Sequence, residues 1–192
     1  MNIFHKFTVK AQKIISKGGV GVILTDTIYG IVCSALSKKS VNRVYRLRKR
    51  NPNKPVIVLI GKLGDLKLFG IKPDSKTTNI LGRLWPGPVS VILPCASSKF
   101  SYLHRGKKTI AFRLPSAPAL RRFLGKTGPL IAPSANFEGK TPAKTVKEAQ
   151  KYFGNKIGFY MDGGKIKSKP STLVSIKDGK ISIIRKGAGY KK

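Results

Sequence analysis

The chain has 192 residues, of which 41% are hydrophobic, and this is enough to bury one good core. It carries 39 Lys and Arg against 7 Asp and Glu, and its net charge of +32 attracts polyanions, RNA foremost. The sequence shows neither an apolar run of about 18 residues nor a basic amphipathic helix with a wide apolar face, so no membrane association is expected. A second interpretation of the charge is that it reflects the whole proteome of the source.

Short β-branched runs alternate with segments whose apolar residues lie three and four apart, which predicts an α/β fold. Strands are expected at Val20–Leu24, Ile31–Ala35, Val56–Ile60, Val89–Leu93, Thr109–Leu114, Leu130–Ala132, Gly158–Tyr160, Thr172–Ile176 and Lys180–Ile184. Helices are expected at Lys6–Ser16, Lys39–Arg50, Ser75–Leu84, Ala117–Leu124 and Thr145–Phe153.

The last two predicted strands are joined by Lys177-Asp178-Gly179-Lys180, whose Asp-Gly pair is a strong hairpin signal. An antiparallel hairpin beside α/β units indicates a mixed sheet. The sequence shows no linker and no internal repeat, so we expect a single domain over residues 1–188 and a basic tail over residues 189–192.

The cysteines and histidines argue against disulfides and zinc. Cys33 and Cys95 lie in apolar runs of strand type, as buried core residues do, which favours a reducing, cytoplasmic location. His5 and His104 are far apart and have no Cys or His at metal-ligand spacing. Residues 1–6 lack the apolar core of a secretion signal.

The first candidate site is the loop Thr25-Asp26-Thr27-Ile28-Tyr29-Gly30, which follows a predicted strand. Three hydroxyls, a carboxylate and a glycine turn are concentrated there, and loops at strand ends of α/β sheets are favoured ligand sites. The alternative is a capped turn, in which Thr25 and Asp26 bond to local backbone donors.

The second candidate is a basic island over residues 46–55, between a predicted helix and a predicted strand. Arg48 and Arg50 offer planar guanidinium donors and Lys54 a compact charge, which suits a polyphosphate. The alternative is a solvated helix end, because the helix dipole favours cations there in any protein.

The third candidate is Ala132-Pro133-Ser134-Ala135-Asn136, where small side chains let a ligand approach the backbone while Ser134 and Asn136 offer polar groups. A structural turn is the alternative. Arg113, Ser171 and Arg185 are weaker candidates at strand ends, where ordinary surface residues are equally expected.

In this order the segments resemble the YrdC-like family over about residues 8–188. Seven motifs carry the resemblance: Thr25-Asp26-Thr27-Ile28-Tyr29-Gly30, Arg48-x-Arg50-x-x-x-Lys54-Pro55, Trp85-Pro86-Gly87-Pro88-Val89-Ser90, Arg113-Leu114-Pro115, Ala132-Pro133-Ser134-Ala135-Asn136, Ser171-Thr172-Leu173-Val174 and Arg185-x-Gly187.

The resemblance implies a single twisted mixed sheet with flanking helices and a concave basic cavity. It also implies the activity of the short bacterial members, which are L-threonylcarbamoyladenylate synthases. These enzymes form threonylcarbamoyl-AMP and pyrophosphate from L-threonine, bicarbonate and ATP, and they feed the proteins that transfer threonylcarbamoyl to tRNA.

Carried over by position, Thr27 and Ser171 would hold threonine, and Arg113 would anchor its carboxylate or the nearby phosphate. The residues that would hold ATP are Arg48 (where the family usually has Lys), Arg50, Lys54, Ser134, Asn136, Thr141 and Arg185.

Arg50, Lys54 and Ser134 are the expected catalytic residues, because positioning and positive charge supply most of phosphoryl-transfer catalysis. With 7 acidic residues the chain has little capacity for a carboxylate metal cage, so Mg²⁺ is expected to be held mainly by ATP phosphates, with no protein ligand assigned.

The chain departs from the family pattern at several positions. Leu59 and Ala117 stand where many members have His, Ser90 stands for Thr and Glu138 for Ser, and the loop Gly139-Lys140-Thr141-Pro142 is one residue short. These departures bear on threonine specificity more than on nucleotide binding.

Two alternatives follow. One is a non-catalytic module of the same fold that grips double-stranded or structured RNA, motivated by the +32 charge. The other is a family relative with a different acceptor, motivated by Leu59 and Ala117.

Overall fold

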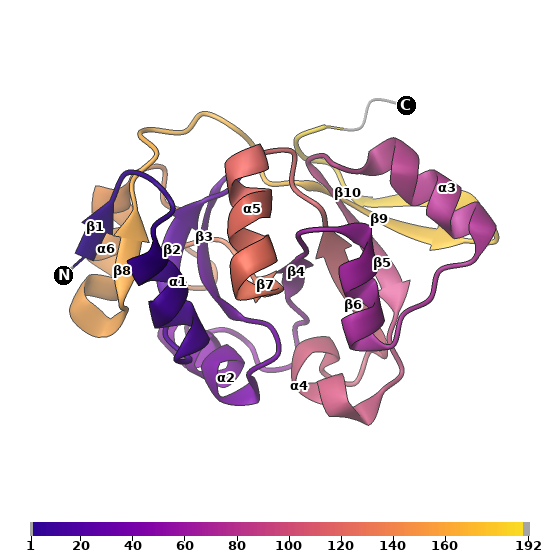
Figure 1. Cartoon of the computed structure of the whole chain (residues 1–192), viewed down its shortest axis with the longest axis horizontal. Helices are drawn as coiled ribbons and strands as arrows, with labels where there is room; N and C mark the ends of the chain where they lie inside the picture. The colour runs from indigo at the N-terminus through magenta and orange to yellow at the C-terminus, as the bar shows by residue number, and fades with distance from the viewer. Residues whose placement is uncertain (1, 190–192) are drawn as a thin grey trace.

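A computed structural model describes residues 2–189, which form a ten-stranded mixed sheet with helices on both faces (Figure 1). The strand order is β1-β8-β2-β3-β7-β4-β6-β5-β9-β10. The strands are β1 (Asn2–Phe4), β2 (Gly21–Leu24), β3 (Tyr29–Ser34), β4 (Ile57–Leu59), β5 (Val89–Pro94), β6 (Thr109–Arg113), β7 (Leu130–Ile131), β8 (Phe159–Met161), β9 (Thr172–Lys177) and β10 (Lys180–Arg185). The helices are α1 (Val9–Ser16), α2 (Lys38–Leu47), α3 (Ser75–Leu84), α4 (Ser101–His104), α5 (Pro118–Thr127) and α6 (Val146–Phe153), with 3₁₀ segments η1 (Leu63–Phe69), η2 (Ser98–Phe100) and η3 (Gly154–Lys156).

The predicted α/β fold with a mixed sheet is confirmed. β4 and β6 pair in parallel, as do β5 and β9, whereas β5 and β6 are antiparallel. β9 and β10 form the predicted hairpin, and its turn residues Asp178 and Gly179 both have positive φ, at 52° and 72°. This turn geometry matches the right-handed twist of the strands that it joins.

Local geometry shifts the ends of two predicted helices. The Thr8 hydroxyl accepts the N–H of the third residue of α1 at 3.1 Å, so this helix begins at Val9, after its predicted start. α2 ends at Leu47 rather than Arg50, because Lys49 has a φ of 50°, which no right-handed helix continues. All nine predicted strands are present, and the sequence pattern misses β1 and α4, which are too short to show a period.

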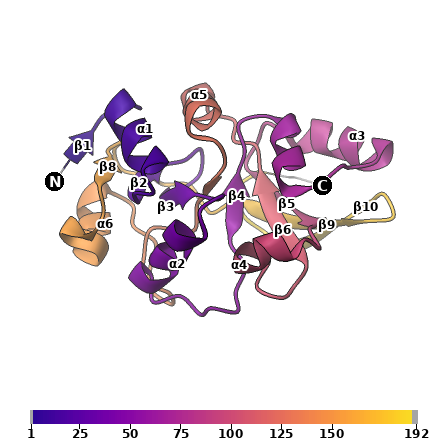
Figure 2. The ribbon, with the colours of Figure 1, turned by 60° about the horizontal axis from the view of Figure 1, so that its bottom comes forward.

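Successive side chains of each strand point to opposite faces of the sheet, and this divides the core into two clusters. Ile23, Val32 and Leu59 pack in the cluster that contains the buried side chains of α1 and α5, whereas Val22 and Cys33 pack in the cluster that contains those of α2 and α6. Figure 2 shows α1 and α5 on one side of the sheet and α2 and α6 on the other.

Two sequence expectations concern the extent of the chain. The single domain over residues 1–188 stays a prediction, and residues 190–192 of the expected basic tail lie outside the described residues. None of the helices within residues 2–189 is long and apolar enough to cross a membrane.

Both cysteines are expected to be unreactive in the folded protein. Cys33 is 0% exposed and Cys95 is 3% exposed, and burial raises the pKa of both thiols, so the reactive thiolate is scarce at neutral pH. Titration with a chromogenic aryl disulfide should detect no fast-reacting thiol in buffer and two in guanidinium. A thiol that reacts within seconds in buffer would contradict this packing.

Candidate active site

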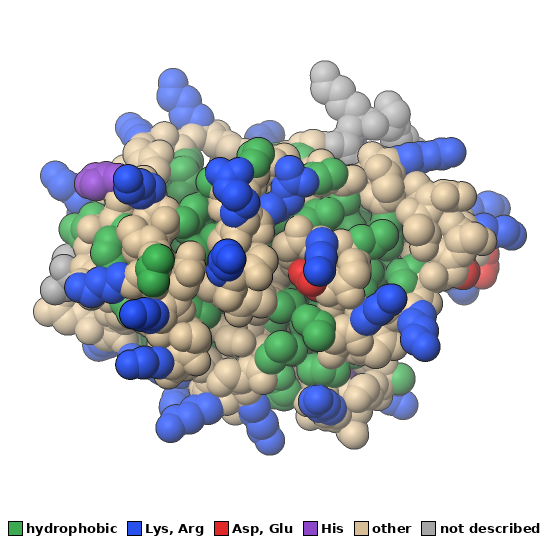
Figure 3. All heavy atoms as spheres, viewed as in Figure 1, with side chains coloured by type: hydrophobic (Ala, Val, Ile, Leu, Met, Phe, Trp, Pro, Cys, Tyr) green, Lys and Arg blue, Asp and Glu red, His purple; other side chains and the backbone are tan. Residues whose placement is uncertain are grey.

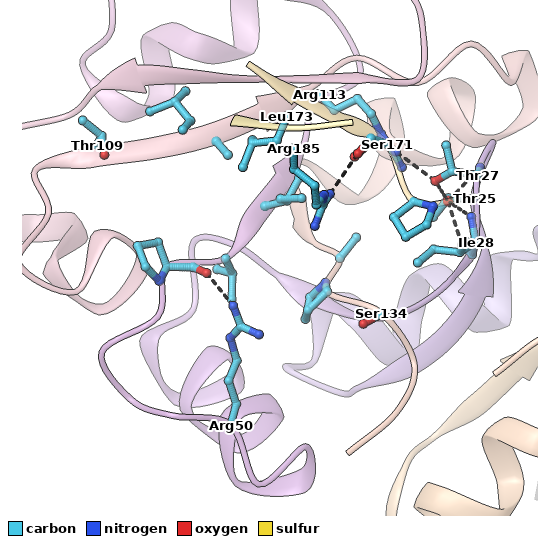
Figure 4. A pocket seen from close by; sticks show the side chains of 18 of the residues that line it. Thr25, Thr27, Ile28, Arg50, Thr109, Arg113, Ser134, Ser171, Leu173 and Arg185 are labelled. Atoms are coloured by element: carbon cyan, nitrogen blue, oxygen red, sulfur yellow. Dashed lines mark hydrogen bonds between the residues drawn. The ribbon is translucent and has the colours of Figure 1, made fainter. Parts of the chain in front are cut away.

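A cavity of about 570 Å³ lies where the loops after β2 and β7 meet the start of β4, the length of β6, the start of β9 and the end of β10 (Figure 4). Among the described residues that line it, none is acidic and four are cationic: Arg50, Lys107, Arg113 and Arg185. Hydroxyl groups line it as well, from Thr25, Thr27, Thr109, Ser134 and Ser171. The cavity therefore combines positive charge with hydrogen-bonding groups.

An apolar wall of the cavity follows from alternation in three neighbouring strands. Ile92 of β5, Ala111 of β6 and Leu173 of β9 line the cavity, and Ile92 and Ala111 are direct partners across the strands. The adjacent partners Val91 and Phe112 are fully buried in the core on the other side. Each strand thus supplies core residues to one face and cavity residues to the other.

A buried ion pair holds the end of β6 against the loop after β2. Arg113 Nη1 donates to the Thr27 hydroxyl at 2.9 Å, and Arg113 Nη2 lies 3.2 Å from Asp26 Oδ1. Asp26 Oδ2 accepts the N–H of Ser116 at 2.9 Å, which fixes the carboxylate. Burial lowers the pKa of Arg113, and the charge of Asp26 opposes that shift. Asp26 therefore positions Arg113, and Arg113 positions the Thr27 hydroxyl.

Ser171 and Arg185 are held by the close approach of the chain after β10 to the start of β9. The Ser171 hydroxyl lies 2.9 Å from that of Ser90, and Arg185 Nη2 donates to the Ser171 carbonyl at 2.9 Å. A Cβ on Gly187 would lie only 2.1 Å from the carbonyl oxygen of Pro170, so this crossing requires glycine. Gly187 thereby permits the approach that places Arg185 in the cavity (Figure 4).

The two arginines of the basic island have different environments. Arg50 lines the cavity, and its Nη2 donates to the Pro55 carbonyl at 2.7 Å. Arg48 is buried against the loop after β7, where it donates to Asn136 O at 3.1 Å, Asn136 Oδ1 at 3.2 Å and Ser134 Oγ at 3.1 Å. Burial, reinforced by the charge of Arg50, lowers the pKa of Arg48 to about 10. Because Arg48 donates to the Ser134 oxygen, the hydroxyl hydrogen of Ser134 remains available for a ligand.

Lys54 and Thr141 also lie outside the cavity lining. Lys54 Nζ is 2.6 Å from Glu138 Oε1, and its side chain is 59% exposed. Thr141 is exposed, and its carbonyl accepts a hydrogen bond from the Tyr152 hydroxyl at 2.8 Å.

The structure thus brings six of the predicted site residues to one cavity: Thr27, Arg50, Arg113, Ser134, Ser171 and Arg185. Four others, Arg48, Lys54, Asn136 and Thr141, are not among the lining residues. The ligand roles of all ten stay predictions.

Two polar residues of the cavity lining, Lys107 and Thr109, lie outside the sequence motifs. Strand alternation places Thr109 on the same face of β6 as Ala111 and Arg113, opposite the buried Ile110. This alternation indicates from the sequence that Thr109 faces the same site as Arg113. Of the two departures thought to affect threonine, Leu59 is fully buried in the core under α5, and Ala117 is the residue before that helix.

Comparison with known sequences identifies the family. The Sua5/YciO/YrdC family model, described as telomere recombination, matches residues 13–187. The chain belongs to this family. A relative from Methanocaldococcus jannaschii is 34% identical over 177 residues, which cover 92% of this chain and 83% of that protein. The threonylcarbamoyl-AMP synthase of Thiobacillus denitrificans is 31% identical over 86% of this chain and 88% of that protein, and that of Marinobacter nauticus is 30% identical over 88% and 90%.

Solved structures of the family share the fold. P. abyssi Sua5 complexed with L-threonine has a TM-score of 0.87 at 24% identity, covering 97% of this chain and 57% of that one. E. coli YciO has a TM-score of 0.84 at 23% identity, covering 99% of this chain and 98% of that one. This chain therefore spans little more than half of the Sua5 chain and nearly all of YciO.

Replacing Asp26 by Asn tests the ion pair behind the cavity. The change leaves the buried Arg113 without its counter-charge, so we expect the free energy of unfolding to fall by about 3 kcal/mol in urea titrations. Asp178→Asn, in the exposed turn of the β9–β10 hairpin, removes the same charge and should change it by less than about 0.5 kcal/mol. Equal effects of the two changes would contradict a specific role for Asp26.

Proposed function

We propose that the chain is an L-threonylcarbamoyladenylate synthase, which converts L-threonine, bicarbonate and ATP to threonylcarbamoyl-AMP and pyrophosphate for modification of tRNA. The observation that carries this proposal is the cavity, where cations and hydroxyls from separate motifs converge in a member of this family. The names of relatives with at least 30% identity support the same activity.

Arg50, Arg185 and Ser134 form the proposed phosphate end of the cavity. Figure 4 shows Arg185 between Arg50 and the cluster of Thr25, Thr27 and Ser171. Guanidinium groups offer paired donors to phosphate oxygens, and the free hydrogen of Ser134 adds a neutral donor. These groups would bind the phosphates and stabilise the charge that develops during transfer.

Thr27, Ser171 and Arg113 form the proposed threonine end. The three side chains are buried: Arg113 pairs with Asp26 and donates to the Thr27 hydroxyl, and Ser171 bonds to Ser90. They are therefore positioned before a ligand enters. The threonine amine and bicarbonate would first form the carbamate with loss of water. An oxygen of the carbamate would then attack the α-phosphorus of ATP, and the bond from that phosphorus to pyrophosphate would break. The carbamate is already an anion, so this attack needs no general base.

Mg²⁺ is proposed to arrive with ATP and to neutralise phosphate charge when bound. Within residues 2–189, no group of three or more His, Cys, Asp or Glu side chains is placed to hold a metal ion. The donor set of the cavity suits phosphates rather than the cation itself, which fits a metal bound through phosphates and water. We also propose a cytoplasmic location, where ATP and tRNA are available.

Pyrophosphate release tests the activity. We expect purified protein to release pyrophosphate from ATP and Mg²⁺ only when both threonine and bicarbonate are supplied, with neither alone sufficient. Mass spectrometry should identify threonylcarbamoyl-AMP as the other product. Well-folded protein that releases no pyrophosphate, or that releases it equally without threonine, would overturn the proposal; a preference for another amino acid would favour a different acceptor.

Arg50→Ala tests the phosphate end. Loss of a charged donor should raise the KM for ATP about tenfold or more while the KM for threonine changes little. Arg46→Ala is the matched control, because Arg46 has the same charge, lies in the last turn of α2 and is not among the cavity residues. Similar kinetics for both variants would argue against phosphate binding by Arg50.

The surface charge favours a second function, RNA binding, which need not exclude the first. The described residues contain two ion pairs, Lys54–Glu138 and Arg113–Asp26, so carboxylates neutralise few of the 39 Lys and Arg. Figure 3 shows these cations spread over the visible face rather than gathered in one patch. Such a surface attracts RNA through counterion release.

Fluorescence anisotropy with double-stranded RNA and tRNA tests this function. We expect binding that weakens steeply as salt rises. Binding retained in Ser134→Ala and Arg185→Ala, and not displaced by ATP, would place RNA outside the cavity. Together with an inactive synthase assay, that result would favour the non-catalytic module; weak binding that is insensitive to salt would contradict RNA binding.

A further inference from the structure

We propose that Glu138 sets the affinity of the cavity for polyphosphates, by holding Lys54 in an ion pair that a bound polyphosphate must displace. This rests on the proposed binding of ATP to the cavity.

Glu138 bridges two positions of the basic island. Its Oε1 is 2.6 Å from Lys54 Nζ, and its other oxygen accepts the N–H of Asn51. The backbone N–H of Glu138 donates to the Arg48 carbonyl at 2.9 Å. Both the backbone and the side chain of Glu138 are therefore bonded to the basic island. Glu138 is therefore placed by its own backbone beside the cations of the island.

The backbone of Lys54 is fixed at the edge of the cavity. Its carbonyl accepts the Tyr45 hydroxyl at 2.7 Å, and the next residue, Pro55, lines the cavity. Arg50, which donates to the Pro55 carbonyl, lines the cavity beside it. Rotation of the long Lys54 side chain would therefore carry its ammonium from Glu138 toward the phosphates without movement of the backbone.

The ion pair is suited to exchange. The Lys54 side chain is 59% exposed, and ion pairs in such positions stabilise a protein little because water and salt screen them. A polyphosphate offers several negative charges and competes effectively with one carboxylate. The hydrogen bonds from Lys54 and from the N–H of Asn51 lower the pKa of the Glu138 carboxyl, and the charge of Arg50 adds to this shift. Until it is displaced, the charge of Glu138 also weakens the positive potential of Arg50.

The negative charge of Glu138 is not needed for its local hydrogen bond. A neutral amide oxygen can still accept the N–H of Asn51, although more weakly than a carboxylate, so Glu138→Gln chiefly removes the charge that acts on Lys54 and Arg50. Removing the charge while keeping the bond therefore isolates the proposed effect.

Calorimetric titration with inorganic tripolyphosphate at low salt tests the proposal without the synthase reaction. Glu138→Gln should lower the Kd about fivefold, because the competing charge is lost. Lys54→Ala should raise the Kd, and adding Glu138→Gln to Lys54→Ala should recover only a small part of the affinity. In the synthase assay, Glu138→Gln should lower the KM for ATP and leave kcat unchanged.

Glu148→Gln is the matched control, because Glu148 also bonds a backbone N–H, that of Lys144, and carries the same charge away from the cavity. If it strengthens binding as much as Glu138→Gln does, the effect is one of net charge and the proposal fails. Glu138→Ser provides a second neutral variant should Glu138→Gln fail to fold. Unchanged affinity in both neutral variants overturns the role of Glu138, whereas no tripolyphosphate binding by the unmodified protein overturns the proposed nucleotide site itself.

Discussion

The buried pair of Arg113 and Asp26 is the contact on which the cavity depends. A guanidinium as deeply buried as that of Arg113 is costly without a counter-charge, and the pair with Asp26 supplies it by holding the end of β6 against the loop after β2. Asp26 is itself fixed by Ser116, which leads into α5. The Thr27 hydroxyl receives its orientation from this arrangement. The hydroxyl end of the cavity is therefore a product of core packing, and its geometry precedes any ligand.

Most of the few carboxylates of the chain accept hydrogen bonds from backbone N–H groups. Six of the seven acidic residues accept a backbone N–H in the described structure: Asp26, Asp65, Asp74, Glu138, Glu148 and Asp162. Acidic residues thus remain where backbone donors need an acceptor, chiefly at helix starts and loops. Because these carboxylates are engaged by backbone donors, most of the cations in the described structure are left without carboxylate partners.

The sequence predicted the elements well because each depends on local periodicity, and it predicted the convergence of motifs through family resemblance. It could not distinguish Arg48 from Arg50, which have the same chemistry two residues apart. The difference is set by Ser134 and Asn136, which bury Arg48 from a distant part of the chain. The partner of Lys54 was hidden for the same reason, because Glu138 approaches through tertiary structure.

The parallel pairing of β5 with β9 has a consequence for how the molecule forms. It joins Val89 to Thr172, a contact of long sequence separation, and such contacts slow folding because a long loop must close first. During synthesis, β5 and the loop that carries Ser134 are made before Ser171 and Arg185. Until then β5 is an edge strand with unpaired backbone groups, open to association with other chains. Closing the cavity and protecting that edge are therefore one late event, completed by the same hairpin.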